Sequence, residues 1–255
     1  MILNKYSNKD TVINFNHSKN KPSNLRIKLL NVQCLTQTKM IELEENMDKE
    51  TIFFLTETHK RDNSIRNKDD TKFIHKIRDL SDKKGGGLMM IWKSDIDMES
   101  RELPTKFKDI LFTENIIGTY KFYSILVYMS VTDFNLNQDI MREIISLVNS
   151  IKDRDILVLG DFNAHIELIG YQKLNKNGET ILNILEKCDL VMLNLDDSKT
   201  TGTVTWQRGD QKSTIGYVMT NFSMLEKIKY MQIVECQEVI SISDHNLIYL
   251  NMEIK

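Results

Sequence analysis

Three polar residues of this sequence end short apolar runs that are typical of buried strands. They are Asn31, Glu57 and Asp161. In open sheets, functional side chains gather where strands end, because the loops there expose them while the sheet fixes their positions. Two carboxylates and an amide in such a place suit the binding of a hard cation and the transfer of protons. We therefore expect these three side chains to converge on one site.

A second polar group stands near the C-terminus. Asp244 and His245 precede an alternating apolar run over 248–254, so an acid and an imidazole lie at the start of the last expected strand. Each such residue, taken singly, is common in turns and on surfaces. Together with the three strand-end residues, the pair is much harder to explain as solvated surface.

The elements that must position these residues are strands alternating with helices. Strand composition predicts strands at 26–32, 51–56, 88–92, 120–129, 156–159 and 247–254. Apolar residues at helical spacing predict helices within 140–151 and 181–188. A third helix is expected around 40–47, where either Thr36 or Thr38 would cap it.

Length and composition favour one α/β domain. Of the 255 residues, 41% are hydrophobic and 27% are charged, which is sufficient for a core of its own. We expect this domain at 25–255. Residues 1–24 are rich in Asn, Lys and Ser, which predicts a flexible N-terminal arm.

Charge and cysteine usage restrict the function classes. The net charge of -2 gives no global attraction to nucleic acid, so a polyanion would have to be held by local groups. Three scattered cysteines without CxxC spacing argue against structural zinc and favour a reducing compartment. Because no apolar stretch has the length of a signal peptide or a membrane span, we expect an intracellular protein, nuclear or cytoplasmic, that is not secreted and meets no membrane.

The candidate residues match, in the same order, the signature blocks of the endonuclease/exonuclease/phosphatase superfamily. These blocks are Asn31, Leu55-Thr56-Glu57-Thr58, Gly160-Asp161-Phe162-Asn163 and Ser243-Asp244-His245. Val127-Tyr128 also resembles the strand that carries the family's catalytic tyrosine. The resemblance covers about residues 25–255 and implies a DNase I-like fold, a four-layer α-β-β-α sandwich with two packed mixed β-sheets.

Within the superfamily, the chain resembles in particular the endonucleases of non-LTR retrotransposons. Residues 202–206 and 213–217 are similar to the Thr-Trp and Ser-x-Ile-Asp-Tyr patterns of that branch. Phosphoinositide phosphatases and sphingomyelinases share the core blocks, but no lipid-specific feature favours them here. The resemblance implies an Mg²⁺-dependent phosphodiesterase that nicks DNA by in-line attack of water.

The resemblance also implies ligands for the metal and contacts with the DNA. Glu57, Asp244 and Asn31 would surround Mg²⁺, for which Mn²⁺ is an alternative, because hard cations bind oxygen. Ser213 and Trp206 would face the DNA. No obligate protein partner is implied, and we expect a monomer.

Four residues would carry the chemistry. Asp161 would accept a proton from the attacking water, and Asn163 would donate a hydrogen bond to the phosphate. A protonated His245 would stabilise the pentacovalent phosphorus, and Tyr128 would donate to the phosphate or assist the leaving oxygen.

Two positions depart from the family pattern. Ser130 stands where a proline commonly follows the tyrosine strand, a change that we expect to be harmless. Gly216 stands where the family carries the aspartate that orients the histidine. By analogy, losing the aspartate that orients a serine-protease histidine costs about 10⁴-fold in turnover. We therefore expect an impaired nuclease rather than an inactive one, unless Asp210 or another acid takes over the missing role.

A different class of function stays open. Gly216, and the lack of a reverse transcriptase segment in these 255 residues, also fit a catalytically decayed or domesticated copy that acts as a DNA- or protein-binding module. A third interpretation is a small-molecule or lipid phosphodiesterase. Nicking assays that include nucleotides and phosphoinositides as substrates would separate the three.

Overall fold

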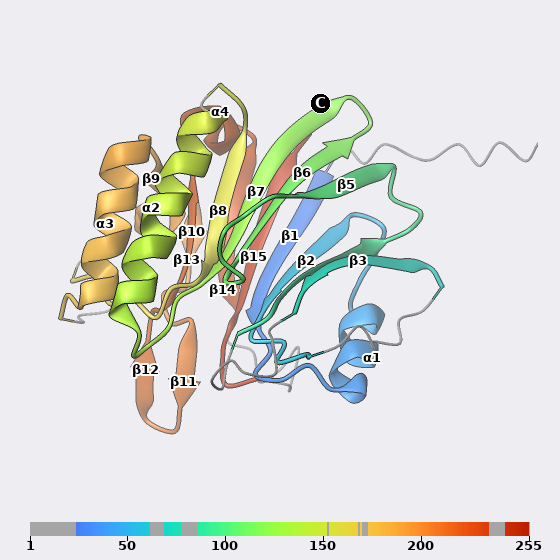
Figure 1. The fold of residues 1–255 in the computed structure, drawn as a ribbon. Helices are drawn as coiled ribbons and strands as arrows, with labels where there is room; N and C mark the ends of the chain where they lie inside the picture. Colours follow the sequence, from blue (N-terminus) through green and yellow to red (C-terminus); the bar gives the residue numbers. More distant parts are fainter. Residues whose placement is uncertain are drawn as a thin grey trace, which may run out of the picture.

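Two β-sheets and their flanking helices make up the part of the chain that the computed structural model describes, residues 24–61, 69–77, 86–151, 153–167, 169, 173–234 and 243–254. The arm expected at 1–24 lies outside these residues, except for Asn24, which begins the first strand. Figure 1 shows the sheets packed between helices, which confirms the α/β sandwich expected from the sequence.

The first sheet has seven strands. Their order across the sheet is β10 (Thr200–Thr201), β14 (Ile228–Val234), β15 (Leu247–Glu253), β1 (Asn24–Asn31), β2 (Thr51–Thr56), β4 (Leu88–Lys93) and β3 (Thr71–Lys76). The sheet is mixed, since β1 is parallel to β2 and antiparallel to β15. Asn31 pairs with Thr56 in the parallel register, so Asn31 and Glu57 lie at the same end of the sheet.

The second sheet has six strands. Their order is β5 (Met98–Leu103), β6 (Ile110–Ile117), β7 (Tyr120–Tyr128), β8 (Ile156–Asp161), β13 (Gly216–Thr220) and β9 (Val191–Met192). β7 is parallel to β8 with Tyr128 opposite Asp161, and β8 is antiparallel to β13 with Asp161 opposite Gly216. Tyr128, Asp161 and Gly216 therefore lie in one row across three neighbouring strands.

Apolar packing joins the layers. The facing sides of the two sheets share one core cluster, which includes Ile27, Phe54, Leu126, Leu159 and Ile248. Such burial contributes about 25 cal/mol per Å² of apolar surface, and it fixes the distance between the sheets. Because the strands of both sheets pack on this core, the residues at their ends lie at the same end of the sandwich, where their side chains can meet.

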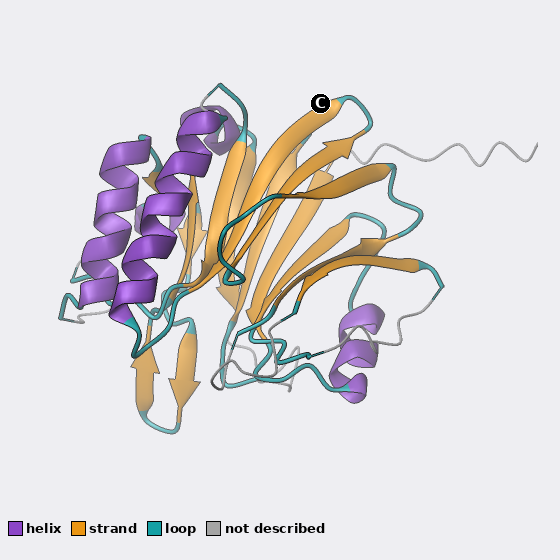
Figure 2. Ribbon diagram, viewed as in Figure 1, coloured by secondary structure: helices purple, strands orange, loops and turns teal. Residues whose placement is uncertain are grey.

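Helices cover the outer faces, as Figure 2 shows in purple. α2 (Phe134–Ser150) and α3 (Lys176–Cys188) lie side by side on the second sheet and share a core cluster with it. α1 (Gln37–Glu45) packs on the first sheet, and the side chain of Thr36 accepts from Lys39 N at 3.2 Å, so Thr36 rather than Thr38 is its cap.

The remaining short elements are η1 (Leu193–Leu195), α4 (Phe222–Leu225) and the hairpin of β11 (Trp206–Arg208) and β12 (Gln211–Ser213). None of the helices in the described ranges combines the length and apolar character that crossing a membrane requires. All six strands and three helices expected from the sequence are present. The strands that the pattern did not predict are β3, β5, β6 and β9 to β14.

A buried carboxylate on β6 illustrates how polar residues are accommodated in these strands. The side chain of Glu114 is 6% exposed, and it is paired with Lys121 and Arg101 and accepts from Tyr123 Oη at 2.8 Å. The hydrogen bond from Lys121 is the main reason why the pKa of Glu114 falls from 4.5 to about 2; burial opposes this shift, and Tyr123 and Arg101 add to it.

We predict that Glu114→Gln lowers the stability of the protein in a pH-dependent way. Because the folded-state pKa is depressed, the contribution of Glu114 is complete above the unfolded pKa of 4.5 and is lost as the pH falls toward about 2. The urea midpoint of the variant should be below that of the original protein at pH 7, and the gap should close between pH 4.5 and pH 2. Glu253→Gln, which removes an exposed partner of Lys229, is the control and should show a much smaller gap. A Glu114 gap that does not change with pH would contradict the assignment.

Candidate active site

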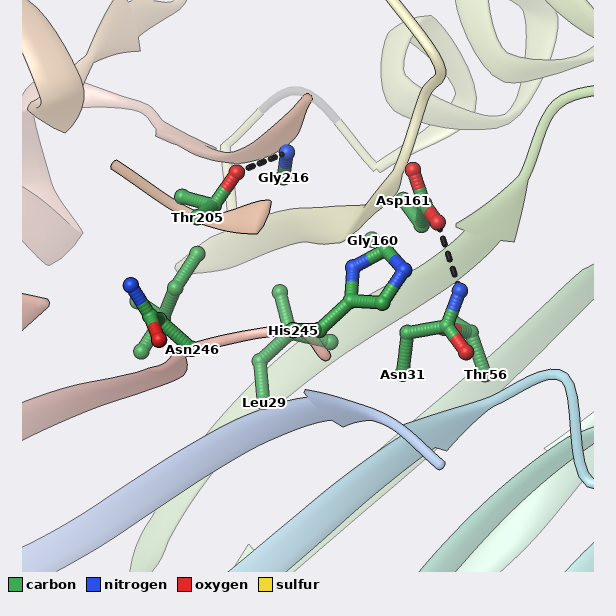
Figure 3. Close-up of a pocket in the computed structure, with 10 residues that line it drawn as sticks. Leu29, Asn31, Thr56, Gly160, Asp161, Thr205, Gly216, His245 and Asn246 are labelled. Atoms are coloured by element: carbon green, nitrogen blue, oxygen red, sulfur yellow. Dashed lines mark hydrogen bonds between the residues drawn. The ribbon is translucent and has the colours of Figure 1, made fainter. Parts of the chain in front are cut away.

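One side-chain amide joins the two sheets at the centre of the site. Asn31 Nδ2 donates to Asp161 Oδ2 at 2.7 Å and to Glu57 Oε1 at 3.0 Å. Asn31 Oδ1 accepts from the backbone N–H of Gln33 at 3.0 Å, and since that group can only donate, the orientation of the amide is defined. Figure 3 shows the contact between Asn31 and Asp161. The structure thus brings together the three strand-end residues that the sequence singled out.

Asp161 is a buried carboxylate, 3% exposed. Burial raises its pKa; attraction to His245 and the hydrogen bond from Asn31 oppose the shift, and the nearby charge of Glu57 adds to it. Its Oδ1 also accepts from the backbone N–H of Asn163 at 3.1 Å. A carboxylate whose affinity for protons is raised and whose position is fixed by donors suits a proton acceptor.

Glu57 follows β2 in a left-handed backbone conformation, with φ 53°. Burial alone would raise its pKa, but hydrogen bonds from His59, Asn31 and Tyr128 outweigh burial and lower it. Glu57 is therefore held as a carboxylate, and the structure places Tyr128 beside it. His59 Nε2 lies 3.1 Å from Glu57 Oε2. His59 was not predicted from the sequence, although its place two residues after Glu57 was a usable signal.

Asn163 is also left-handed, with φ 47°, a conformation that few residues other than glycine adopt. Its Nδ2 donates to Met129 O, the residue after β7, at 2.8 Å. An amide nitrogen carries two hydrogens, so one N–H of Asn163 stays available for a ligand. The site residue thus has a fixed orientation and a free donor.

The Ser243-Asp244-His245 segment closes the site from the last strand. Ser243 Oγ donates to Asn31 O at 2.6 Å and accepts from His245 N at 3.1 Å, which ties the segment to the end of β1. His245 Nε2 lies 3.7 Å from Asp244 Oδ1. Among the described residues, Asp244 Oδ1 has no hydrogen-bond partner although it is buried.

The site has no side chain at position 216, where the family carries an aspartate. A cavity of about 10 Å³, enough for one water molecule, is lined by Gly216, Thr205, His245 and Asp161 among others. Figure 3 shows the His245 ring in the same pocket as Asp161 and Gly216. Thr205 Oγ1 accepts from Gly216 N at 2.9 Å, and no described carboxylate takes the orienting position opposite Asp161.

The β11–β12 hairpin carries the two residues expected to face DNA. Trp206 pairs with Ser213 within the hairpin and forms an isolated bridge with His245. Gln207 N donates to Asp244 O at 2.9 Å, so the hairpin is anchored to the histidine segment. Both Trp206 and Ser213 are half-buried. Figure 1 shows the hairpin extending below the sheets.

The fold and this arrangement define a protein of the endonuclease/exonuclease/phosphatase class with a DNase I-like fold. The endonuclease domain of TRAS1, a telomere-specific non-LTR retrotransposon, is 17% identical with TM-score 0.70, and the match covers 91% of this chain and 99% of that one. The AP endonuclease LMAP from Leishmania major is 11% identical with TM-score 0.71, with 91% and 89% covered. The 3′ phosphatase NExo from Neisseria, bound to a product DNA hairpin, is 14% identical with TM-score 0.67, with 90% and 100% covered. At these identities the likeness concerns the fold.

The family follows from the sequence match. The family model described as endonuclease-reverse transcriptase matches residues 122–249, and the chain belongs to this family. No curated protein matches the chain significantly. The matched region includes Tyr128, Asp161, Asn163, Gly216 and His245, so the glycine lies inside the family region.

We predict that Asp161→Asn, which removes the proposed proton acceptor, becomes more stable relative to the original protein as the pH rises. Because the folded-state pKa of Asp161 is raised, ionising this carboxylate costs stability as the pH rises above 3.8, and the amide avoids that cost. The difference in Tm, variant minus original protein, should therefore increase from pH 4 to pH 7. The amide nitrogen of the variant faces a donor, either Asn31 Nδ2 or Asn163 N–H, which lowers the Tm by an amount that does not depend on pH.

Asp155→Asn is the control of opposite sign. Burial opposes the shift, but hydrogen bonds from Ser223, Lys227 and Tyr120 lower the pKa of Asp155, so its replacement should lower the Tm at pH 7. A difference in Tm for Asp161→Asn that stays constant or falls from pH 4 to pH 7 would show that the charge of Asp161 is not a cost to the fold.

Proposed function

We propose that this protein is an Mg²⁺-dependent DNA endonuclease of retrotransposon type that nicks DNA by in-line attack of water, and that Gly216 impairs it. The observation that carries the proposal is the amide of Asn31, which holds Glu57 and Asp161 together from two sheets. Membership of a nuclease family supports the reaction class. The proposal includes DNA as the substrate and a monomer that needs no obligate partner.

The residues present fit a magnesium ion. Asp244 Oδ1 is a buried carboxylate oxygen without a hydrogen-bond partner among the described residues, and a cation would satisfy it. Glu57 adds a carboxylate oxygen, and Asn31 Oδ1, which accepts one hydrogen bond from Gln33 N, has a second lone pair that an ion would use. Water and substrate phosphate commonly complete the coordination of Mg²⁺. No cluster of three or more His, Cys, Asp or Glu side chains suited to a metal occurs in the described ranges. Mn²⁺ has the same ligand preference and is an alternative.

The chemistry requires that charge on the phosphate be neutralised as water attacks. When bound, the metal supplies positive charge near the non-bridging and leaving oxygens. Asp161 takes the proton of the water, because its buried carboxylate has a raised pKa. The second N–H of Asn163 donates to a phosphate oxygen, and His245, when protonated, stabilises the pentacovalent phosphorus.

Gly216 affects the His245 part of this machinery alone. The backbone N–H of His245 donates to Ser243 Oγ, and ring Nε2 lies 3.7 Å from Asp244 Oδ1, but the carboxylate that the family places at position 216 is replaced by glycine. This observation also favours the alternative, a catalytically decayed or domesticated copy that acts as a DNA- or protein-binding module. The two functions differ in whether any nicking occurs.

We predict that Gly216→Asp raises the rate of plasmid nicking with Mg²⁺, by up to about 10⁴-fold on the analogy of the serine-protease aspartate. A Cβ at Gly216 would lie 3.3 Å from Ile248 Cδ1 and 3.6 Å from Thr205, and the backbone is not left-handed, so the substitution fits once the tip of Ile248 moves slightly. Gly216→Asn is the matched control, since it fills the same space without a charge and should restore much less. Glu57→Ala should abolish nicking.

The outcomes separate the candidate functions. If neither the original protein nor Gly216→Asp nicks intact or abasic DNA, the endonuclease proposal fails and the binding module becomes the better account. If phosphoinositides or nucleotides are hydrolysed while DNA is not, the protein is a phosphodiesterase of another substrate class.

We predict that Mg²⁺ stabilises the protein through Glu57 and Asp244. A ligand at a hundredfold excess over its Kd adds about 2.7 kcal/mol to the free energy of unfolding, which calorimetry would detect as a higher Tm that EDTA reverses. Glu57→Gln and Asp244→Asn should lose this increase. Asp210→Asn, in the exposed turn of the β11–β12 hairpin, should retain it. An undiminished increase in Glu57→Gln would place the ion elsewhere.

A further inference from the structure

Two buried asparagines connect the covering helices to the candidate active site. Asn137 on α2 is 1% exposed and Asn177 on α3 is 6% exposed. Asn137 Oδ1 accepts from the backbone N–H of Ser130 at 2.9 Å, and Asn137 Nδ2 donates to Ser130 O at 2.7 Å and to Asn177 Oδ1 at 2.9 Å. Buried amides are costly unless they are bonded, and this pair is bonded to a loop that follows β7.

The bonds define the orientation of both amides. The Ser130 N–H can only donate, which fixes Asn137 Oδ1 as its acceptor and leaves Asn137 Nδ2 to face Asn177 Oδ1. A proline at position 130 has no N–H and could not begin this chain of bonds. Ser130, which departs from the family pattern, therefore takes part in orienting Asn177.

The side chain of Asn177 contacts the loop that carries Asn163. Its Nδ2 lies within hydrogen-bonding distance of Phe162 O at 3.0 Å, Asn163 O at 3.2 Å and Ser130 O at 3.2 Å. Asn175 Nδ2 donates to Asn163 O as well, at 3.1 Å. The loops after β7 and β8 are thus held by one nitrogen of Asn177.

The hydrogen bonds to the Asn163 loop determine where the second Nδ2–H of Asn163 points. The left-handed backbone of Asn163 persists only if its surroundings hold it there, and its carbonyl is held by Asn175 and Asn177. Its side chain is held by Met129 O, so the direction of the remaining N–H depends on the position of this backbone. A shift of about 1 Å in such a group can cost about 100-fold in rate.

We propose that Asn177, oriented by Asn137 and Ser130, is a positioning residue that directs the Asn163 amide toward the scissile phosphate. This inference rests on the proposed endonuclease function. The plainer interpretation is that the two asparagines only join α2 to α3. Gln138 and Thr180 separate the two interpretations, because Gln138 Nε2 donates to Thr180 Oγ1 at 2.8 Å and joins the same helices without touching either loop.

The experiment compares Asn177→Ala with Gln138→Ala in steady-state nicking of a DNA duplex with Mg²⁺. Asn177→Ala should lower kcat by about 10- to 100-fold and change KM by less than about 3-fold, whereas Gln138→Ala should stay within about 3-fold in both. In an Asn163→Ala background, Asn177→Ala should add no further loss, since it acts through Asn163. Equal losses from Asn177→Ala and Gln138→Ala, or an undiminished loss in the Asn163→Ala background, would overturn the proposal.

Two further measurements keep the test decisive. If Asn177→Ala does not fold, Asn137→Ala, which touches neither Phe162 nor Asn163, replaces it in the same comparison with the same expected direction. A crystal structure of the Asn177 or Asn137 variant should show Asn163 Nδ2 displaced from Met129 O, and an unmoved Asn163 would overturn the inference. This structural result does not depend on activity, so it is distinguishable from a failure of the original protein to nick DNA.

Discussion

The site depends on one constraint, the close approach of a buried carboxylate, Asp161, and a half-buried one, Glu57, where two sheets meet. Asp161 comes from the second sheet and Glu57 follows a strand of the first, and their like charges would repel in the low-dielectric interior without a donor between them. The Asn31 amide supplies that donor to both. The Asn163 side of the site is held by further amides, while the His245 side lacks a carboxylate at Gly216. The Asn163 side of the site is therefore held by more side-chain groups than the His245 side.

Fully buried strands could be predicted because they form continuous apolar runs. Those at 51–56 and 156–159 were found in this way, and the structure confirms them. β6 was missed since its residues 113–115 are polar, and their partners, such as Lys121 and Arg101 for Glu114, are supplied by neighbouring strands. β14 was missed because its pairing with β15 has an irregularity between Ile228 and Tyr230 that breaks the alternation.

The residues of the site could be predicted from the sequence, because their types at strand ends and the order of the signature blocks are features of the sequence itself. The contacts between them could not, since the bond from Asn31 to Asp161 spans 130 positions. The asparagine pair on α2 and α3 was missed because its members are 40 positions apart and match no motif. Their role arises only when both helices pack on the second sheet. The role of Ser130 in orienting these asparagines could not be predicted either, because the partner of its N–H lies on α2.

The central claim is that these residues surround a single phosphate of DNA. A crystal structure of the unmodified protein with Mg²⁺ and a short DNA duplex tests it most directly. The account predicts a phosphate in contact with Asn163 and His245, with Asp161 facing the attacking water and the ion bound to Glu57 and Asp244. A duplex bound on another face, or an ion that does not touch Glu57, would contradict it.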